Sequence, residues 1–276
     1  MNRRHMRSPF WQALWRPGAA VASPPLVFVA TTAVLILQIP AQLMMRGGWI
    51  SASILMNEIL AVAGIPILLV YLLGFDRRRL LSFGRFDLPT FVALCLFMLG
   101  AVVLMDYATV LTERLWPLPP ELKEAMDRVL KAGTAGMIAW KLILLCLIPA
   151  VCEEIFFRGF CQTSLAARWG GAWAIVAASI IFSMMHGNPH YFHLYFMLGV
   201  IFGWAYAVTG ALWAAVFCHL FNNAWTFVNH VRGFEFPIAE RWCAADTVLV
   251  AVSALVLIVS VRFIVVRSNA VRSRRN

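Results

Sequence analysis

Long apolar segments dominate the chain, and short polar breaks separate them. Eight apolar windows lie near residues 26–45, 52–73, 88–111, 137–166, 172–186, 191–208, 211–229 and 247–266. A helix needs about 20 apolar residues to cross a bilayer, whereas a spanning strand needs only about 10 residues of alternating polarity. The windows are long and do not alternate. The pattern therefore predicts an all-α membrane bundle of about eight transmembrane helices.

Turn-forming residues mark the breaks between the windows. They lie at Arg46-Gly47-Gly48, from Gly74 to Asp87, and at Gly170-Gly171, Gly187-Asn188-Pro189 and Thr209-Gly210. The fourth window is unusually long and the fifth is short. No internal repeat is visible, which argues against a transporter built from duplicated halves.

The segment 112–136 has a different pattern, with charges of alternating sign. Its apolar residues recur at helical spacing, at Leu122, Met126, Val129 and Leu130. Pro119 and Pro120 suit the start of a helix and Gly133 suits its end. We expect a short amphipathic helix that lies on the membrane surface.

The amino-acid composition is typical of a protein that is surrounded by lipid. The chain is 62% hydrophobic and 13% charged, against about 25% charged in soluble domains. A net charge of +10 would favour nucleic-acid binding in a soluble protein. Here the arginines concentrate at the chain ends and in the 74–87 loop, so we expect no nucleic-acid partner. Counting Lys and Arg in alternate connections predicts that both termini are cytoplasmic, in a bacterial inner membrane.

Six charged side chains fall inside the apolar windows: Glu58, Asp106, Lys141, Glu153, Glu154 and Arg158. Such residues are costly in a bilayer and are candidates for function. The first three lie within about two turns of a predicted helix end, so the membrane interface or an interfacial partner explains them. The last three lie together in the apolar sequence PAVCEEIFFRGF, which is harder to explain in this way.

The spacing of these three residues predicts which of their side chains share a helix face. Glu154 and Arg158 are four residues apart, share a helix face and can pair. Glu153 points about 100° away from Glu154 and needs another partner. The cluster can be a structural ion pair with a satisfied carboxyl group. It can also hold a general base, since a buried carboxylate suits that role.

Histidines concentrate after this cluster. Five of the six lie in 186–230, at His186, His190, His193, His219 and His230. Phe182 precedes His186 by four residues and Asn223 follows His219 by four, so each pair shares a helix face. Asn222 is three residues from His219, and spacing alone leaves open which of the two amides acts.

Helix lengths test whether these residues can meet. A hairpin turn at Gly170-Gly171 places Glu153 and His186 at nearly equal depth, about 25 Å from the turn. Straight helices leave His186 and His219 about 14 Å apart in depth. We expect the 187–190 turn to dip into the bundle and line a water-filled cavity, because its polar side chains would be costly against lipid.

Three short sequences together resemble a known family. The sequences CEEIFFR, FSMMH and HLFNN are similar to the three motifs of the CPBP family of CAAX proteases and bacteriocin-processing enzymes. This family is also called the type II CAAX prenyl endopeptidase or abortive-infection family. The motif region runs from about 137 to 229, a third of the chain. Three motifs in the right order, each in an apolar helix, make the resemblance specific.

The resemblance implies roles for individual residues. Glu153 and His186 would activate a water, and His219 and Asn223 would stabilise the oxyanion. Three further residues would support them: Glu154 and Arg158 hold the site and Phe182 packs beneath His186. The implied activity is intramembrane cleavage of a peptide or membrane-protein substrate by a helical bundle. The division of the chain is then a cytoplasmic segment (1–25), N-terminal transmembrane helices (26–111), the amphipathic helix (112–136), a CPBP-like catalytic core (137–229), and a final transmembrane helix with a basic tail (230–276).

Other interpretations remain open. Glu153, His186 and His219 could instead form a zinc site with an open fourth position, although no His-Glu-x-x-His helix is present. The resemblance favours metal-free glutamate chemistry. A non-catalytic membrane partner or immunity protein is an alternative function, and a proton-coupled transporter that uses Glu153 and the histidines is another.

Overall fold

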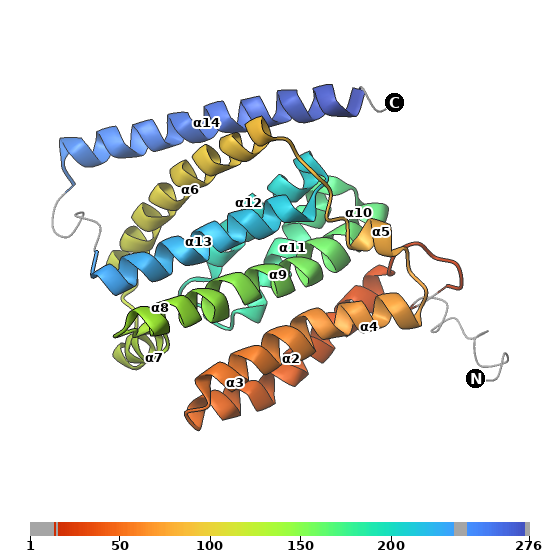
Figure 1. The fold of residues 1–276 in the computed structure, drawn as a ribbon, viewed down its shortest axis with the longest axis horizontal. Coiled ribbons are helices and arrows are strands. Elements are labelled where there is room, and N and C mark those ends of the chain that lie inside the picture. Colours follow the sequence, from red (N-terminus) through yellow and green to blue (C-terminus); the bar gives the residue numbers. More distant parts are fainter. Residues whose placement is uncertain (1–13, 15, 235–241, 274–276) are drawn as a thin grey trace.

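The computed structural model describes residues 14, 16–234 and 242–273, and within them every regular element is helical (Figure 1). The N-terminal half contains α2 (Pro24–Arg46), α3 (Ile50–Leu55), η2 (Met56–Ala63), α4 (Gly64–Leu72), α5 (Arg77–Leu80), α6 (Leu88–Leu115) and α7 (Pro120–Leu130). The C-terminal half contains α8 (Ala135–Lys141), η3 (Leu142–Leu147), α9 (Ile148–Glu154), η4 (Ile155–Gln162), α10 (Thr163–Trp169), α11 (Gly171–Met185), α12 (Phe192–Thr209), α13 (Leu212–Arg232) and α14 (Ala244–Ser273). The all-α prediction is confirmed.

Each predicted window corresponds to one helical segment. The second window is the continuous rod α3–η2–α4, and the fourth is α8 to α10, in which π-helical turns alternate with α-helix. Six segments in the described part of the chain are long and apolar enough to cross a membrane. The helix α11 is apolar but has only 15 residues, about 22 Å. The protein is therefore an integral membrane helical bundle.

Short polar side chains and glycines set the helix ends. Ser23 accepts a hydrogen bond from the backbone N–H of Leu26 at 3.3 Å and begins α2. Asp87 caps α6 in the same way. Gly210 ends α12 in the left-handed conformation at φ 68°, which a glycine adopts without a steric penalty. Asp87 and Gly210 lie in breaks predicted from turn chemistry.

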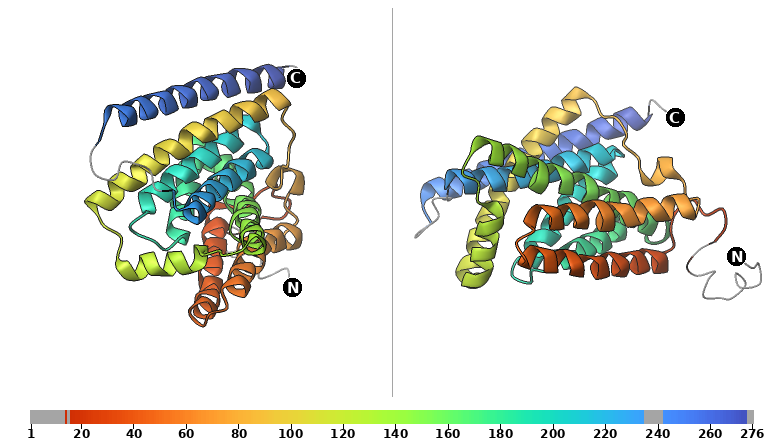
Figure 2. Two further views of the ribbon diagram at one scale, coloured as in Figure 1. Left: turned by 60° about the vertical axis from the view of Figure 1, so that its left-hand side comes forward. Right: turned by 60° about the horizontal axis from the view of Figure 1, so that its bottom comes forward.

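The segment 137–229, predicted as the catalytic core, lies in the middle of the bundle. In Figures 1 and 2 the α8–α10 rod runs beside α11, α12 and α13, with α2 and the α3–α4 rod on one side and α6 on the other. The last helix, α14, packs along the outside of α6. Tyr107 donates to Asp246 at 2.8 Å near one end of this pair, and Arg267 bonds to Asp87 at 2.5 Å near the other.

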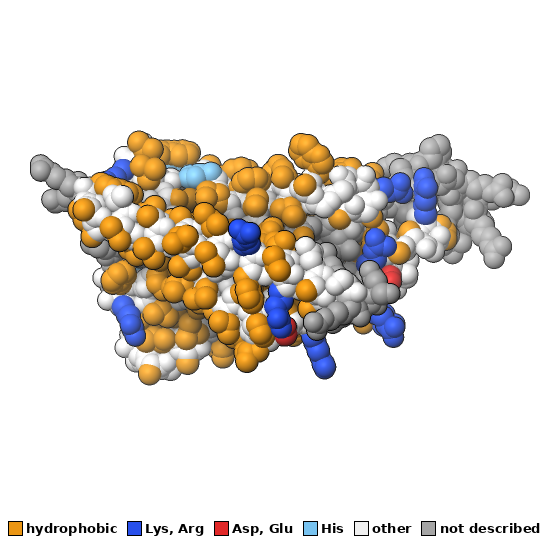
Figure 3. All heavy atoms as spheres, turned by 90° about the horizontal axis from the view of Figure 1, so that it is seen from above, with side chains coloured by type: hydrophobic (Ala, Val, Ile, Leu, Met, Phe, Trp, Pro, Cys, Tyr) orange, Lys and Arg blue, Asp and Glu red, His pale blue; other side chains and the backbone are white. Residues whose placement is uncertain are grey.

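The outer surface is apolar. Figure 3 shows a face on which hydrophobic side chains far outnumber charged ones. The helix α14 alone exposes Val248, Leu249, Val252, Leu255, Ile258, Val259, Phe263 and Val266. So large an exposed apolar surface is typical of contact with lipid.

The amphipathic helix is shorter than its predicted segment. Residues 112–115 continue α6, and only Pro120–Leu130 forms α7. Figure 1 places α7 at one end of the bundle, whereas the loop with α5 lies at the other end, on the side where α2 begins and α14 ends. The predicted N-terminal segment 1–25 is described only at residue 14 and from residue 16 onward.

Candidate active site

A cavity of about 710 Å³ opens between α6, α7 and the catalytic-core helices. Glu153, His186, His219, Asn222 and Asn223 all line it. The structure thus brings together side chains from α9, α13 and the residue that follows α11. Sequence separations of more than 30 residues are closed by packing of these helices against one another.

Glu154 joins two cationic or protonatable side chains at one oxygen. Its Oε1 accepts from Arg158 Nη1 at 2.8 Å and lies 2.8 Å from His219 Nδ1. Arg158 and Glu154 are about fully buried, at 1% and 0% exposed, and Arg158 Nη2 also donates to the Gly199 carbonyl at 2.9 Å. The ion pair predicted from the four-residue spacing is present. It fixes the ring of His219 beside the α9–η4 junction.

Aromatic rings surround this ion pair. The Arg158 guanidinium lies 5.0 Å from the Phe182 ring centroid and 5.3 Å from that of Phe202. The His219 ring stacks on Phe202 with centroids 4.9 Å apart and an interplanar angle of 18°. Cation–π contacts add to the ion pair in a dry environment. The aromatic shell holds Arg158 and His219 in single orientations.

His186 has a defined tautomer. Its Nδ1 lies 2.8 Å from the Phe182 carbonyl oxygen, and a carbonyl only accepts, so Nδ1 carries the proton. In the neutral ring Nε2 then presents its lone pair. The ring also stacks on Tyr195 at 4.0 Å and rests against the Phe182 ring at 4.5 Å. These contacts orient Nε2 as a base or an acceptor.

Glu153 is the unpaired carboxyl of the motif. It comes one residue before Glu154 on α9 and lines the cavity, whereas Glu154 points into the protein interior. Glu153 Oε2 is buried and has no hydrogen-bond partner among the described residues. A buried carboxylate oxygen without a protein partner is a site for an ordered water or a substrate group.

The predicted depth mismatch between His186 and His219 is resolved at Phe182. This ring lies 4.5 Å from the His186 ring and 5.8 Å from the His219 ring, measured between centroids. The turn after α11 packs against the end of α6, where Tyr191 donates to Glu113 and His193 Nε2 lies 2.8 Å from Thr112 Oγ1. His186 and Tyr191, on either side of the turn, line the cavity, whereas residues 187–190 do not, so the turn does not line the cavity as expected. Burial and the Glu113 hydrogen bond raise the pKa of the Tyr191 hydroxyl above its ordinary value.

Both candidate asparagines lie at the cavity. Asn223 Nδ2 donates to the Leu145 carbonyl at 3.4 Å, and Asn222 Nδ2 donates to Asn223 Oδ1 at 3.3 Å. The two amides form one short chain that ends on η3. The choice between them, left open by spacing, stays open in the structure.

Sequence reasoning missed Glu58. It was assigned to the membrane interface, but it is 6% exposed and lines the same cavity as Glu153. Asn57 Nδ2 donates to Glu58 Oε1 at 2.9 Å, and Oε2 has no partner among the described residues. Its position within η2 gives a usable signal, because π-helical turns are frequent at functional sites, but that signal appears only in the structure.

The other two charged residues assigned to the interface have specific partners. Asp106 accepts from Trp225 Nε1 at 2.8 Å and lines the cavity. Lys141 donates to the carbonyls of Val129 and Lys131, at the C-terminal end of α7. Lys141 thus has its partner at the end of α7, the helix predicted to lie on the membrane surface. Asp106 instead belongs to the cavity wall.

The zinc interpretation fits the arrangement poorly. Among the described residues no three His, Cys, Asp or Glu side chains are grouped closely enough to hold a metal ion. We therefore derive no step through zinc.

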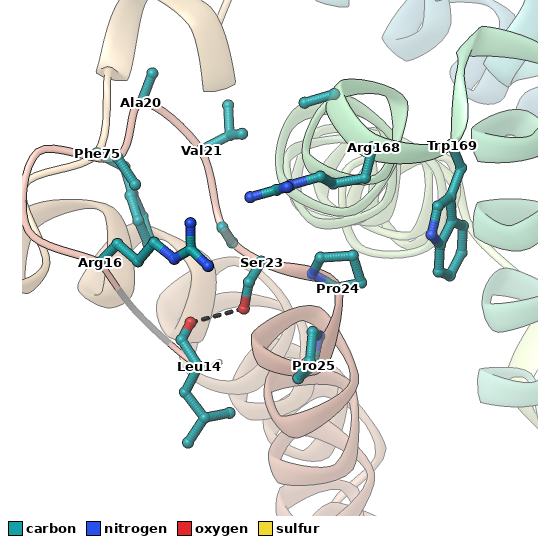
Figure 4. A pocket seen from close by; sticks show the side chains of 13 residues that line it. Leu14, Arg16, Ala20, Val21, Ser23, Pro24, Pro25, Phe75, Arg168 and Trp169 are labelled. Carbon is teal, nitrogen blue, oxygen red and sulfur yellow. Dashed lines mark hydrogen bonds between the residues drawn. The ribbon is translucent and has the colours of Figure 1, made fainter. Parts of the chain in front are cut away.

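A second pocket, of about 600 Å³, lies at the end of the bundle that carries the termini. Figure 4 shows Arg16 and Arg168 at this pocket, beside Trp169, Phe75 and the Ser23 hydroxyl that donates to Leu14. None of the motif residues lines it. It offers no carboxyl–histidine pair, so the cavity at Glu153 is the candidate active site.

Comparisons with known proteins point to the same region. Residues 135–225 match the family model described as type II CAAX prenyl endopeptidase Rce1-like. Over 91 residues the chain is 28% identical to "Putative membrane peptidase YdiL" of Bacillus subtilis. That match covers 33% of this chain and 37% of the relative. No solved structure matches. The matched region contains all three motifs, and the findings support the CPBP resemblance.

Proposed function

On the premise that residues 135–225 form a CPBP domain of the Rce1-like type, we propose that the protein is an intramembrane endopeptidase. It hydrolyses a peptide bond of a substrate that enters the cavity at or within the membrane. The observation that carries this proposal is the shared cavity: an unpaired glutamate, a histidine of fixed tautomer and a His–Asn set line one space.

Glu153 and His186 bind and activate the water. The Glu153 carboxylate accepts a proton as the water oxygen attacks the carbonyl carbon of the scissile bond. Nε2 of His186 accepts the second hydrogen bond of the water and orients it. Glu153 then passes the proton to the departing amine nitrogen as the C–N bond breaks. The products are a carboxylic acid and an amine, so one water is consumed for each bond that is cut.

His219 and the asparagines stabilise the developing oxyanion. Glu154 accepts from Nδ1 of His219, which leaves Nε2 of the ring for the substrate oxygen when the ring is doubly protonated. Glu154 holds the orientation of the His219 ring, and Arg158 holds Glu154 in place. Donors preorganised in a dry site contribute about 3–4 kcal/mol to lowering a barrier of this kind.

The experiment is cleavage of a quenched fluorescent library of membrane peptides by the purified protein. We expect turnover by the wild type, loss of turnover in Glu153→Ala and in His219→Ala, and no effect of a metal chelator. Loss of activity with chelator that added zinc restores would move Glu153, His186 and His219 into a metal site. No turnover together with an unaltered cellular phenotype for Glu153→Ala would favour a non-catalytic membrane partner.

The orientation in the membrane is part of the proposal. We place both termini in the cytoplasm of a bacterial cell and α7 on the opposite face of the inner membrane, because basic residues concentrate at the end with α5. Protease applied to sealed vesicles tests this. Cleavage of α7 from the cytoplasmic face alone would contradict it.

A further inference from the structure

The wall of the active-site cavity is rich in carboxyl groups. Its described lining includes four carboxyl groups, those of Glu58, Asp106, Glu113 and Glu153, and no Lys or Arg. The nearest arginine of the motif, Arg158, is bound to Glu154 and lies outside the lining. The protein thus builds an acidic space inside an apolar bundle, where uncompensated charge is costly.

The partners of these carboxyl groups are neutral or absent. Asn57 donates to Glu58 and Trp225 donates to Asp106, while Tyr191 donates to Glu113. None of the four acids forms an ion pair with another described residue. In addition, one oxygen of Glu58 and one of Glu153 are buried with no protein partner among the described residues. These orphaned oxygens point to a ligand that brings hydrogen-bond donors.

The acids form a path from the surface inward. Asp106, Thr109 and Glu113 are spaced at i, i+3 and i+7 on α6, so they share one helix face, and all three line the cavity. Glu113 is exposed, Asp106 is half-buried and Glu58 is 6% exposed. A cleft lined with one sign of charge and walled by apolar groups attracts ligands of the opposite sign.

We propose that this cavity selects a substrate segment that carries positive charge, a lysine, an arginine or a free amine beside the scissile bond. This inference rests on the proposed function, because it names the substrate class of the same site. Asp106 and Glu113 bind the cationic group on the α6 side.

The test uses one membrane peptide in three forms, with Lys, Gln or Glu next to the position of cleavage. Binding to the purified wild-type protein is measured by fluorescence anisotropy, and cleavage is measured as kcat/KM. We expect the Lys form to bind up to about fivefold more tightly than the Gln form, since a partly exposed ion pair contributes up to about 1 kcal/mol. The Glu form should bind most weakly. The preference should fall in 1 M salt, where charges are screened.

Variants of the two acids on α6 test whether they cause the preference for the Lys form of the peptide. Asp106→Asn and Glu113→Gln should each reduce the Lys-to-Gln binding ratio, through a higher KM for the Lys form. The matched control is Glu121→Gln, an exposed acid of α7 outside the cavity lining, which should leave the ratio unchanged. Equal binding of the three forms, or a ratio that both wall variants leave intact, would overturn the inference. Cleavage of the Gln form that depends on Glu153 would still uphold the proposed function in that case.

Discussion

His219 Nδ1 and Glu154 Oε1 lie 2.8 Å apart in an almost fully buried contact, and the same oxygen accepts from Arg158. Glu154 therefore ties the candidate oxyanion histidine on α13 to the helix that carries Glu153. A single carboxylate sets both the stability of the core and the orientation of a ring at the site.

We expect Glu154→Gln to destabilise the protein strongly. The neutral amide leaves the buried guanidinium of Arg158 without its counter-charge, and breaking a buried pair in this way costs about 3–5 kcal/mol. The measurement is the unfolding midpoint in detergent. Replacing both partners, as in Glu154→Met with Arg158→Met, should be less damaging than Glu154→Gln because no charge is left buried. A double variant less stable than the single one would contradict this.

Gly199 is a close-packing position behind the site. A Cβ there would lie 2.8 Å from Ser179 Cβ and 2.9 Å from Ser179 Cα on α11. Gly199→Ala must push α11 and α12 apart, which costs about 1–3 kcal/mol, and it shifts the carbonyl that accepts from Arg158. Thermal unfolding should show the loss. Gly171→Ala is the control, because its Cβ would meet nothing within 4 Å, and an equal loss in both would refute the packing argument.

The Asp87–Arg267 bond should make stability depend on pH. Hydrogen bonds from Arg267, and then from Thr90, hold the pKa of the Asp87 carboxyl well below its ordinary value of 3.8. A lowered folded-state pKa means that the contribution is present above about pH 4 and is lost as pH falls through the folded value. Asp87→Asn should therefore lower the unfolding temperature at pH 7, and by progressively less as the pH falls below about 4.

The control for this prediction is Asp127→Asn, which removes an exposed carboxylate from α7. Unfolding temperatures of both variants are compared with the wild type from pH 3 to pH 7. If the difference in unfolding temperature between Asp87→Asn and the wild type stays constant from pH 3 to pH 7, the carboxylate charge does not hold α14 against α6.

Lys141 is expected to hold α7 over the cavity. Its ammonium donates to two carbonyls at the C-terminal end of α7, and Met126, Val129 and Leu130 of α7 line the cavity. A hydrogen bond from a charged donor contributes about 1.5–3 kcal/mol, so Lys141→Met should speed amide exchange of residues 120–131 at least about tenfold. Lys131→Met removes an equal charge without removing a donor to α7 and should leave exchange unchanged. Equal rates in both variants would mean that packing alone retains the helix.

The sequence predicted the helices well. A helix that crosses a bilayer needs a long apolar segment, and glycines indicate where several of these helices end. Spacing also predicted the Glu154–Arg158 pair, since the contact is local. Spacing along straight helices separates His186 from His219 in depth, and the structure shows that the Phe182 ring lies against both histidine rings.

Glu58 was beyond sequence reasoning for a physical reason. A lone carboxyl in an apolar helix has the same pattern whether it reaches the interface or turns inward. The difference depends on which face of α3–η2–α4 packs on α9, a long-range property of the bundle. The same is true of Asp106, whose direction is set by Trp225 on α13.

The most direct test is the initial rate at which the purified protein cleaves one membrane peptide, compared between wild type and Glu153→Gln. Glu124→Gln, an exposed acid on α7, serves as the matched control. The account predicts at least about a hundredfold loss for Glu153→Gln, as expected on removal of a general base, with normal unfolding temperature and full activity in the control. Equal rates for Glu153→Gln and wild type would contradict glutamate-dependent proteolysis.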